Sequence, residues 1–280
     1  MPVGEKNDIL IVFVHANFIF KVLQFFKQSF VQVDRLKVFF HVSFDSFFIF
    51  SLRTVGGNHA EKGEKMQQQY EQIIDELSET FAVKSFITDR SDFIFILESP
   101  HIQELKYGIP VAGQSGSTMS KNLFGEQYTK PLGLLVKINF EQNKNRKTLN
   151  KIGLLNVSEI PMQRKAYQNV EVITRYRTFF DHLETIRSNS HKLHFSQPEI
   201  NDLYHVLMKR FEERLKLLLD RTCTIVPCGR VAQRFFQNAS IKGERWQIIH
   251  DVPHPSYHSW SQPRYREKIN EVREAFFSQL

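Results

Sequence analysis

Short apolar runs alternate with longer amphipathic stretches over most of this chain. Four runs, residues 93–97, 151–157, 224–227 and 246–252, are dominated by β-forming apolar residues and predict strands. Apolar positions at helical spacing predict helices over 66–81, 117–124, 229–237 and 263–279, and a long helix that starts at a capping box in 196–199. This alternation predicts an α/β fold, a three-layer α/β/α domain with a central, mainly parallel sheet of about four strands.

Two of the predicted strands run directly into polar loops that contain proline. The first strand continues into Glu98-Ser-Pro-His101, and the last continues into Asp251-Val-Pro-His-Pro-Ser-Tyr-His258. Proline lacks an N–H and restricts the residue before it, so neither loop extends a strand or starts a regular helix. Open α/β sheets bind ligands at the carboxyl ends of their strands, so we expect the two loops to share one pocket.

The first 65 residues differ in composition from the rest. They hold 12 of the 26 Phe and no Tyr or Trp. The apolar run over residues 9–20 is too short for a membrane span, and no small-residue cleavage site of a signal peptide follows it. Residues 61–66, Glu-Lys-Gly-Glu-Lys-Met, can be encoded by GAA AAA GGA GAA AAA ATG, which contains a bacterial ribosome-binding sequence before ATG. We therefore hypothesise that residues 1–65 are an extension of translated upstream sequence, and we expect residues 66–280 to form the domain.

The chain is mildly basic and poor in cysteine. Its net charge of +7 and pI of about 9.3 are compatible with a polyanionic partner, although an ordinary basic surface gives the same values. Two cysteines, Cys223 and Cys228, cannot form a Cys-rich zinc site or hold an iron–sulfur cluster alone. Their scarcity favours a reducing compartment, and we expect a cytoplasmic protein with no membrane partner.

Four segments, in order, resemble motifs of the uracil-DNA glycosylase superfamily. Leu97-Glu-Ser-Pro-His101 and residues 108–116 are similar to the G-E-A-P-G and G-x-P-F-V-G-x-A-G segments of its thermostable bacterial branch. Residues 154–157 resemble the family's T-N-V or L-L-N strand, residues 228–235 its L-G-x-x-A turn, and residues 254–256 its H-P-S motif. The chain thus resembles a divergent bacterial member, with similarity over roughly residues 93–265.

The resemblance implies a monomeric DNA-repair enzyme that flips a damaged base, with uracil expected, out of DNA and hydrolyses its glycosidic bond. His254 would donate to O2 of the leaving base, Asn156 would read its pairing edge, and Glu98 would position or activate water. Ser99 stands where the most active branch carries Asp. Structural alternatives stay open: His254 could cap a strand end, Asn156 could bond its own loop, and Glu98 could form a salt bridge.

The same resemblance places further residues around the base and the DNA. Pro100, Gly113, Ser256 and Phe124 are expected to line the base pocket, with Phe124 or His101 replacing the aromatic residue that the family has at Val111. Tyr257, Trp260 and Ser115 are expected to contact DNA, with Tyr257 or Trp260 as a wedge that fills the gap left by the flipped base. Trp260 could instead pack against the closing helix.

No metal or cofactor is expected. His250, His254 and His258 are four residues apart, but Pro253 and Pro255 prevent the helix that would align them as ligands. Cationic residues in the long segment between 161 and 224 could follow a phosphate backbone, but a solvated helical face is the favoured explanation; they are Arg164, Lys165, Arg175, Arg177, Arg187 and Lys192. Ser99 and Val111 favour an alternative, a glycosylase-like nucleic-acid-binding protein without catalysis. A third possibility is an enzyme acting on another nucleobase or nucleoside.

A shortened chain that begins at Met66 should fold with the stability and activity of the full chain, because residues 1–65 would contribute nothing to the core. Urea denaturation of both chains measures this. Mass spectrometry of the natively expressed protein gives the independent test. A native peptide from residues 38–53 would show that the upstream segment is translated and would contradict the expectation.

Overall fold

The computed structural model describes residues 39–42, 48–51 and 57–278, and the chain divides into two compact units, residues 1–65 and 66–280. In the first unit, β1 (Phe39–Val42) pairs antiparallel with β2 (Phe48–Ser51). The apolar run over 9–20 lies outside the described residues. Helix α2 (Gly57–Phe81) starts upstream of Met66, where the sequence pattern had placed its beginning.

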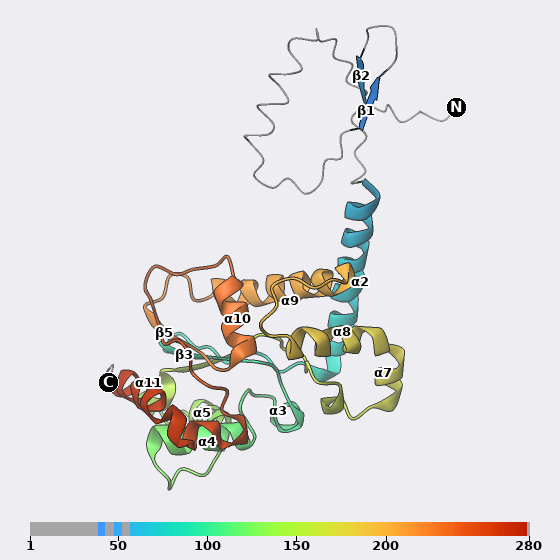
Figure 1. Cartoon of the computed structure of the whole chain (residues 1–280). Helices are drawn as coiled ribbons and strands as arrows, with labels where there is room; N and C mark the ends of the chain where they lie inside the picture. The colour runs from blue at the N-terminus through green and yellow to red at the C-terminus, as the bar shows by residue number, and fades with distance from the viewer. Residues whose placement is uncertain (1–38, 43–47, 52–56, 279–280) are drawn as a thin grey trace. The chain divides into compact units, whose positions relative to one another are not determined.

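A four-stranded parallel sheet forms the centre of the second unit (Figure 1). It consists of β3 (Phe93–Leu97), β4 (Ile152–Asn156), β5 (Cys223–Pro227) and β6 (Trp246–Ile248), in the order β4-β3-β5-β6. The predicted α/β fold with a mainly parallel sheet of about four strands is confirmed. Strand β6 ends earlier than expected, and Asp251 then adopts a left-handed backbone with φ 60°.

Helices connect and cover the strands. They are α3 (Ile102–Tyr107), α4 (Gln114–Phe124), α5 (Leu132–Glu141), α6 (Lys147–Asn150), η1 (Arg164–Ala166), α7 (Val170–Arg175), α8 (Arg177–Ser188), α9 (Pro198–Lys216), α10 (Arg230–Asn238), η2 (Ser256–Ser261), η3 (Pro263–Tyr265) and α11 (Arg266–Ser278). Within the described part of the chain, no helix is both long and apolar enough to cross a membrane.

The central strand β3 is buried on both faces, and its alternate side chains enter two separate cores. Ile94 and Ile96 pack into a core with side chains of α2, α8, α9 and α10. Phe93, Phe95 and Leu97 pack into the opposite core, with α4, α5 and α11. The layers follow from a strand that is apolar at every position, because such a strand needs cover on both sides.

The connections place a topological switch point between β3 and β5. The chain passes from β3 to β4 through α3–α6, and α4 and α5 cover one face. It passes from β4 to β5 through α7–α9, and α8 and α9 cover the other face. Connections that leave on opposite faces open a crevice at the carboxyl ends of the two middle strands.

The segment 98–116, which follows β3, contains the short helix α3. The Glu104 side chain accepts a hydrogen bond from the backbone N–H of His101 (2.6 Å), which satisfies a donor at the helix start. Gly108 ends the helix in a left-handed conformation, with φ 66°.

Trp260 packs inside the second core. It is 1% exposed, its ring centroid lies 6.0 Å from that of Phe95, and its indole N–H donates to the Pro253 carbonyl (2.8 Å). A DNA-contacting role for Trp260 is therefore not supported, because a wedge must be free to enter the duplex. The packing alternative describes Trp260 instead.

Trp260→Ala should lower the free energy of unfolding by about 3–5 kcal/mol, because it removes a large buried side chain and its hydrogen bond. Urea denaturation monitored by circular dichroism measures the loss. Tyr257→Ala is the matched control in the same segment, since Tyr257 is 89% exposed and should change stability by less than about 0.5 kcal/mol. Equal effects of the two substitutions would contradict this packing role.

Candidate functional site

Backbone hydrogen bonds draw four strand-end loops together at the switch point. The N–H of Ser158, after β4, donates to the carbonyl of Glu98, after β3 (3.1 Å). The N–H of Cys228, after β5, donates to Ile96 of β3 (2.8 Å), and the N–H of Gly229 donates to Val252, after β6 (2.9 Å). The two proline-containing loops, which the sequence predicted to share a pocket, thus lie at one edge of the sheet.

The His254 backbone is fixed from three sides. Side-chain donors reach the three consecutive carbonyls of its loop: Gln233 Nε2 to Val252 O (2.8 Å), Trp260 Nε1 to Pro253 O (2.8 Å) and Ser259 Oγ to His254 O. Gly229 has φ 87°, and a Cβ built on it would lie 2.6 Å from His254 Cβ. The β5–α10 turn therefore requires glycine here, because any other residue would displace His254.

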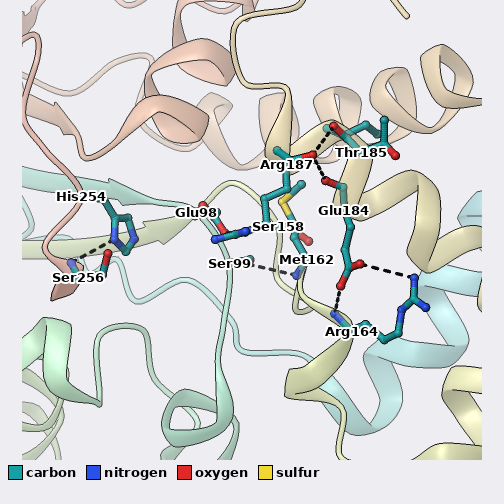
Figure 2. Close-up of polar contacts among 12 residues, drawn as sticks. Glu98, Ser99, Ser158, Met162, Arg164, Glu184, Thr185, Arg187, His254 and Ser256 are labelled. Carbon is teal, nitrogen blue, oxygen red and sulfur yellow. Dashed lines mark hydrogen bonds and ion pairs between the residues drawn. The ribbon is translucent and has the colours of Figure 1, made fainter.

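The hydrogen bonding of the His254 ring selects one tautomer. The backbone N–H of Ser256 donates to Nδ1 at 3.2 Å, so Nδ1 is the acceptor and Nε2 carries the proton of the neutral ring (Figure 2). Burial lowers the pKa of His254, the nearby Glu98 carboxylate raises it, and the Arg187 cation lowers it. The result is a neutral imidazole with an Nε2–H donor at the strand end.

Glu98 pairs with a cation from a distant part of the chain. Its Oε1 accepts from Nε of Arg187, on α8, and its side chain is only 14% exposed (Figure 2). The salt-bridge alternative for Glu98 therefore describes a real contact of this site. Arg187 belongs to the segment between 161 and 224, whose cations the sequence predicted to lie on a solvent-exposed helical face. Its apolar neighbours on α8, Phe179, Phe180, Leu183 and Ile186, are buried and were the available signal for its placement.

Asn156 presents a buried amide at the end of β4. It lies opposite Leu97 in the parallel register and is 1% exposed. Neither its Oδ1 nor its Nδ2 has a hydrogen-bond partner in the described part of the chain, while its backbone carbonyl accepts from Arg214 Nη2 (3.2 Å). The alternative that the side chain bonds its own loop does not apply. A buried amide of this kind costs about 1–3 kcal/mol when unpaired, so a partner from outside the described chain would stabilise it.

Ser99 and Glu104 hold the loop that follows β3. Ser99 Oγ accepts from the backbone N–H of Met162 (3.1 Å), which ties this loop to the one that follows β4 (Figure 2). Glu104, which the motif comparison missed, accepts from the N–H groups of His101 (2.6 Å) and Val111 (2.9 Å). Burial raises the pKa of Glu104 to about 7, its two backbone hydrogen bonds lower it, and Glu98 adds to the rise.

The second half of this loop is tightly packed and strained. Val111 has φ 49°, an unusual conformation for a β-branched residue. A Cβ on Gly116 would lie 1.8 Å from the Val111 carbonyl oxygen, so only glycine permits this approach. Gly113 begins α4 as its N-cap, Ser115 is half-buried in its first turn, and Pro100 is buried.

Phe124 lies away from the predicted base pocket. It ends α4, and its ring packs against Phe276 (centroids 5.8 Å apart), which in turn contacts Phe93 (5.1 Å). Phe93 is the first residue of β3, at the end of the sheet opposite Glu98. The expectation that Phe124 contacts a base is therefore not supported, because α4 carries its last residue to the amino ends of the strands.

Tyr257 remains available as a DNA contact. It is 89% exposed and has φ 52°, and His258 next to it has φ 53°. Non-glycine residues in this region are strained, and such strain persists where the surrounding structure fixes it, often at functional sites. No group of three or more His, Cys, Asp and Glu side chains that could hold a metal ion is found in the parts of the chain that the structure describes.

No protein-family model matches this chain, and comparison with curated proteins finds no significant match. Its function must therefore be inferred from the chemistry of the strand-end residues.

His254 should titrate below the ordinary histidine pKa of about 6.5, because burial opposes the charged ring. Two-dimensional NMR of the ¹⁵N-labelled histidine rings should show His254 as the Nε2–H tautomer at neutral pH, with assignment by His254→Gln. A protonated Nδ1, or a pKa above the ordinary value, would contradict the described hydrogen bond and its burial.

Proposed function

We propose that this protein is a DNA glycosylase that hydrolyses the N-glycosidic bond of uracil or a related damaged base in DNA. The unpartnered, buried amide of Asn156 carries this proposal. Asn156 pairs with Leu97, the last residue of β3, and Glu98 follows Leu97 directly. The amide and the Glu98 carboxylate therefore belong to adjacent strand ends. The resemblance of the strand-end motifs to the uracil-DNA glycosylase superfamily supports the same reaction.

Asn156 would recognise the pairing edge of the flipped base. Its Oδ1 accepts the N3–H of uracil, and its Nδ2 donates to O4, so one amide satisfies two neighbouring groups. The base in turn supplies the hydrogen bonds that the buried amide lacks within the described chain. Burial of Asn156 makes this match selective, because a base without these groups would leave the amide unpaired.

His254 would stabilise the leaving base. As the N1–C1′ bond breaks, its electron pair passes to the base, and negative charge spreads to O2. The neutral Nε2–H of His254 donates to that oxygen, and the hydrogen bond strengthens as the charge grows. The Ser256 N–H that fixes Nδ1 as an acceptor keeps the proton on the nitrogen where the reaction needs it.

Glu98 would serve the attacking water. The water oxygen forms the new bond to C1′, its proton passes to the carboxylate, and the base anion takes a proton from solvent. Arg187 occupies Oε1, so this role falls to Oε2.

Tyr257 would enter the base stack of the duplex as the damaged base leaves it. Stacking on a base contributes about 1–3 kcal/mol, and the exposed ring of Tyr257 is free to make this contact.

A second candidate is binding of a flipped base without hydrolysis. It is favoured by Ser99, whose hydroxyl already accepts from the Met162 N–H and brings no second carboxylate to the loop. The same residues would then recognise damage without excising it.

Abasic-site formation on duplexes that hold one uracil, hypoxanthine, xanthine or G·T mismatch separates the two candidates. The wild-type protein should form abasic sites on at least the uracil duplex. His254→Ala should slow excision about 10²–10³-fold with little change in DNA affinity, as loss of such a donor does elsewhere. Asn156→Asp should reduce the preference for uracil over cytosine, because it replaces a donor with an acceptor.

His205→Ala is the matched control, since His205 is an exposed histidine on α9. It should leave the excision rate unchanged. Abasic sites formed at equal rates by wild type and His254→Ala would refute the role of His254. Binding of the uracil duplex without any abasic product would establish the second candidate instead.

A further inference from the structure

A groove adjoins the candidate site on the side of α8. Its volume is about 870 Å³, and it is lined by η1 and α8, including Arg164, Lys165, Glu184 and Arg187. Two contacts join it to the strand ends: Arg187 Nε donates to Glu98, and the N–H of Met162, just before the groove, donates to Ser99. Figure 2 shows the groove residues Arg164, Glu184 and Arg187 on the side of Glu98 and Ser99.

The two carboxylates of the groove, Asp181 and Glu184, share a single cation, Arg164. Arg164 Nη2 pairs with Asp181 and lies 3.5 Å from Glu184 Oε2, and its backbone N–H donates to Glu184 Oε1 (3.0 Å). Lys165, which is exposed, has no hydrogen-bond or ion-pair partner among the residues that the structure describes. Lys165 on η1 is thus a cation of this groove that no described carboxylate engages.

Arg187 has donors to spare as well. A guanidinium carries five N–H groups, and the contact with Glu98 uses only Nε. The carboxylate fixes the plane of the guanidinium, and Nη1 and Nη2 have no partner among the described residues, so they can bind a second anion. Burial lowers the pKa of His101, and the charges of Lys165 and Arg187 lower it further, which places both cations close to the strand-end loop.

We propose that Arg187 and Lys165 bind a DNA phosphate next to the flipped nucleotide, with Glu98 holding the Arg187 guanidinium in place for that contact. This inference rests on the proposed function, since the anion is a phosphate of the same DNA. Planar, two-donor recognition of phosphate is what arginine provides better than lysine, and a fixed guanidinium loses little entropy when it binds. The segment between β4 and α9 thereby becomes part of the DNA-binding surface.

Salt dependence of binding tests the proposal without relying on catalysis. The probe is a fluorescent duplex with a single 2′-fluoro-2′-deoxyuridine, a uracil nucleotide whose glycosidic bond resists hydrolysis, measured by anisotropy over a series of KCl concentrations. Each phosphate contact contributes about 0.9 to the slope of log K against log salt. Because the two cations share one phosphate, Arg187→Gln/Lys165→Gln should reduce that slope by about 0.9, and each single substitution should reduce it by less.

Lys144→Gln is the matched control, because Lys144 lies in the turn after α5, near the amino ends of the strands. It removes the same charge and should leave the slope unchanged, while Arg187→Lys should restore most of it. A slope that is unchanged in both groove variants, or that falls equally in Lys144→Gln, would overturn the proposal.

Replacing single phosphates with uncharged methylphosphonates locates the contact. The substitution on one side of the uracil nucleotide should weaken binding of the wild type, have a smaller effect on Arg187→Gln, and have none on Arg187→Gln/Lys165→Gln. If methylphosphonate substitution at either flanking phosphate weakens binding of the wild type and of Arg187→Gln by the same factor, a direct contact between Arg187 and a flanking phosphate is refuted. The probe is not cleaved, so this test does not depend on catalysis. If the methylphosphonate effect depends on Arg187 but ordinary uracil DNA releases no base, the phosphate contact stands and the glycosylase proposal is rejected.

Discussion

The parallel pairing of β3 with β4 on one side and β5 on the other is the constraint on which the rest of the structure depends. Every residue of β3 is buried, and the strand is paired along its length from Phe93 onward. A shift of one residue would exchange its two faces and place Phe93 and Phe95 in the opposite core. The register is therefore fixed by both cores, and with it the point where each strand ends.

Those strand ends determine which polar groups meet. Glu98 and Asn156 follow directly from the β3–β4 register, and His254 is added because the turn after β5 bonds to the loop after β6. Gly229 makes that approach possible. Val111, Asp251 and Tyr257 in these loops have left-handed backbone conformations, which cost conformational free energy. The packing of the two cores and the hydrogen bonds of the loops offset this strain.

Much of the fold could be predicted from the sequence, because apolar runs and helical spacing are local signals. The four strands and the two proline-broken loops were found in this way. Helix α3 was missed because it is short and has no buried residue. Its stabilising contact, from the Glu104 side chain to two backbone N–H groups, joins residues up to seven positions apart and follows no simple period.

The site was only partly predictable, because tertiary placement decides it. The family resemblance placed Phe124 in the base pocket and Trp260 at the DNA, but α4 runs away from the site and Trp260 turns into the core. Arg187 was not singled out, since its contact with Glu98 spans 89 positions and depends on how α8 packs. Motifs identify residues at strand ends, whereas only packing shows what approaches them from other elements.

The unpaired amide of Asn156 is the central claim, and NMR observes it directly. The side-chain NH₂ resonance of ¹⁵N-labelled Asn156 should shift when the protein binds a duplex that holds 2′-fluoro-2′-deoxyuridine, because Nδ2 gains an acceptor. The same duplex with cytosine at that position should leave it unchanged. An Asn156 resonance that is insensitive to the uracil duplex under conditions where the protein is fully bound would contradict base recognition at this site.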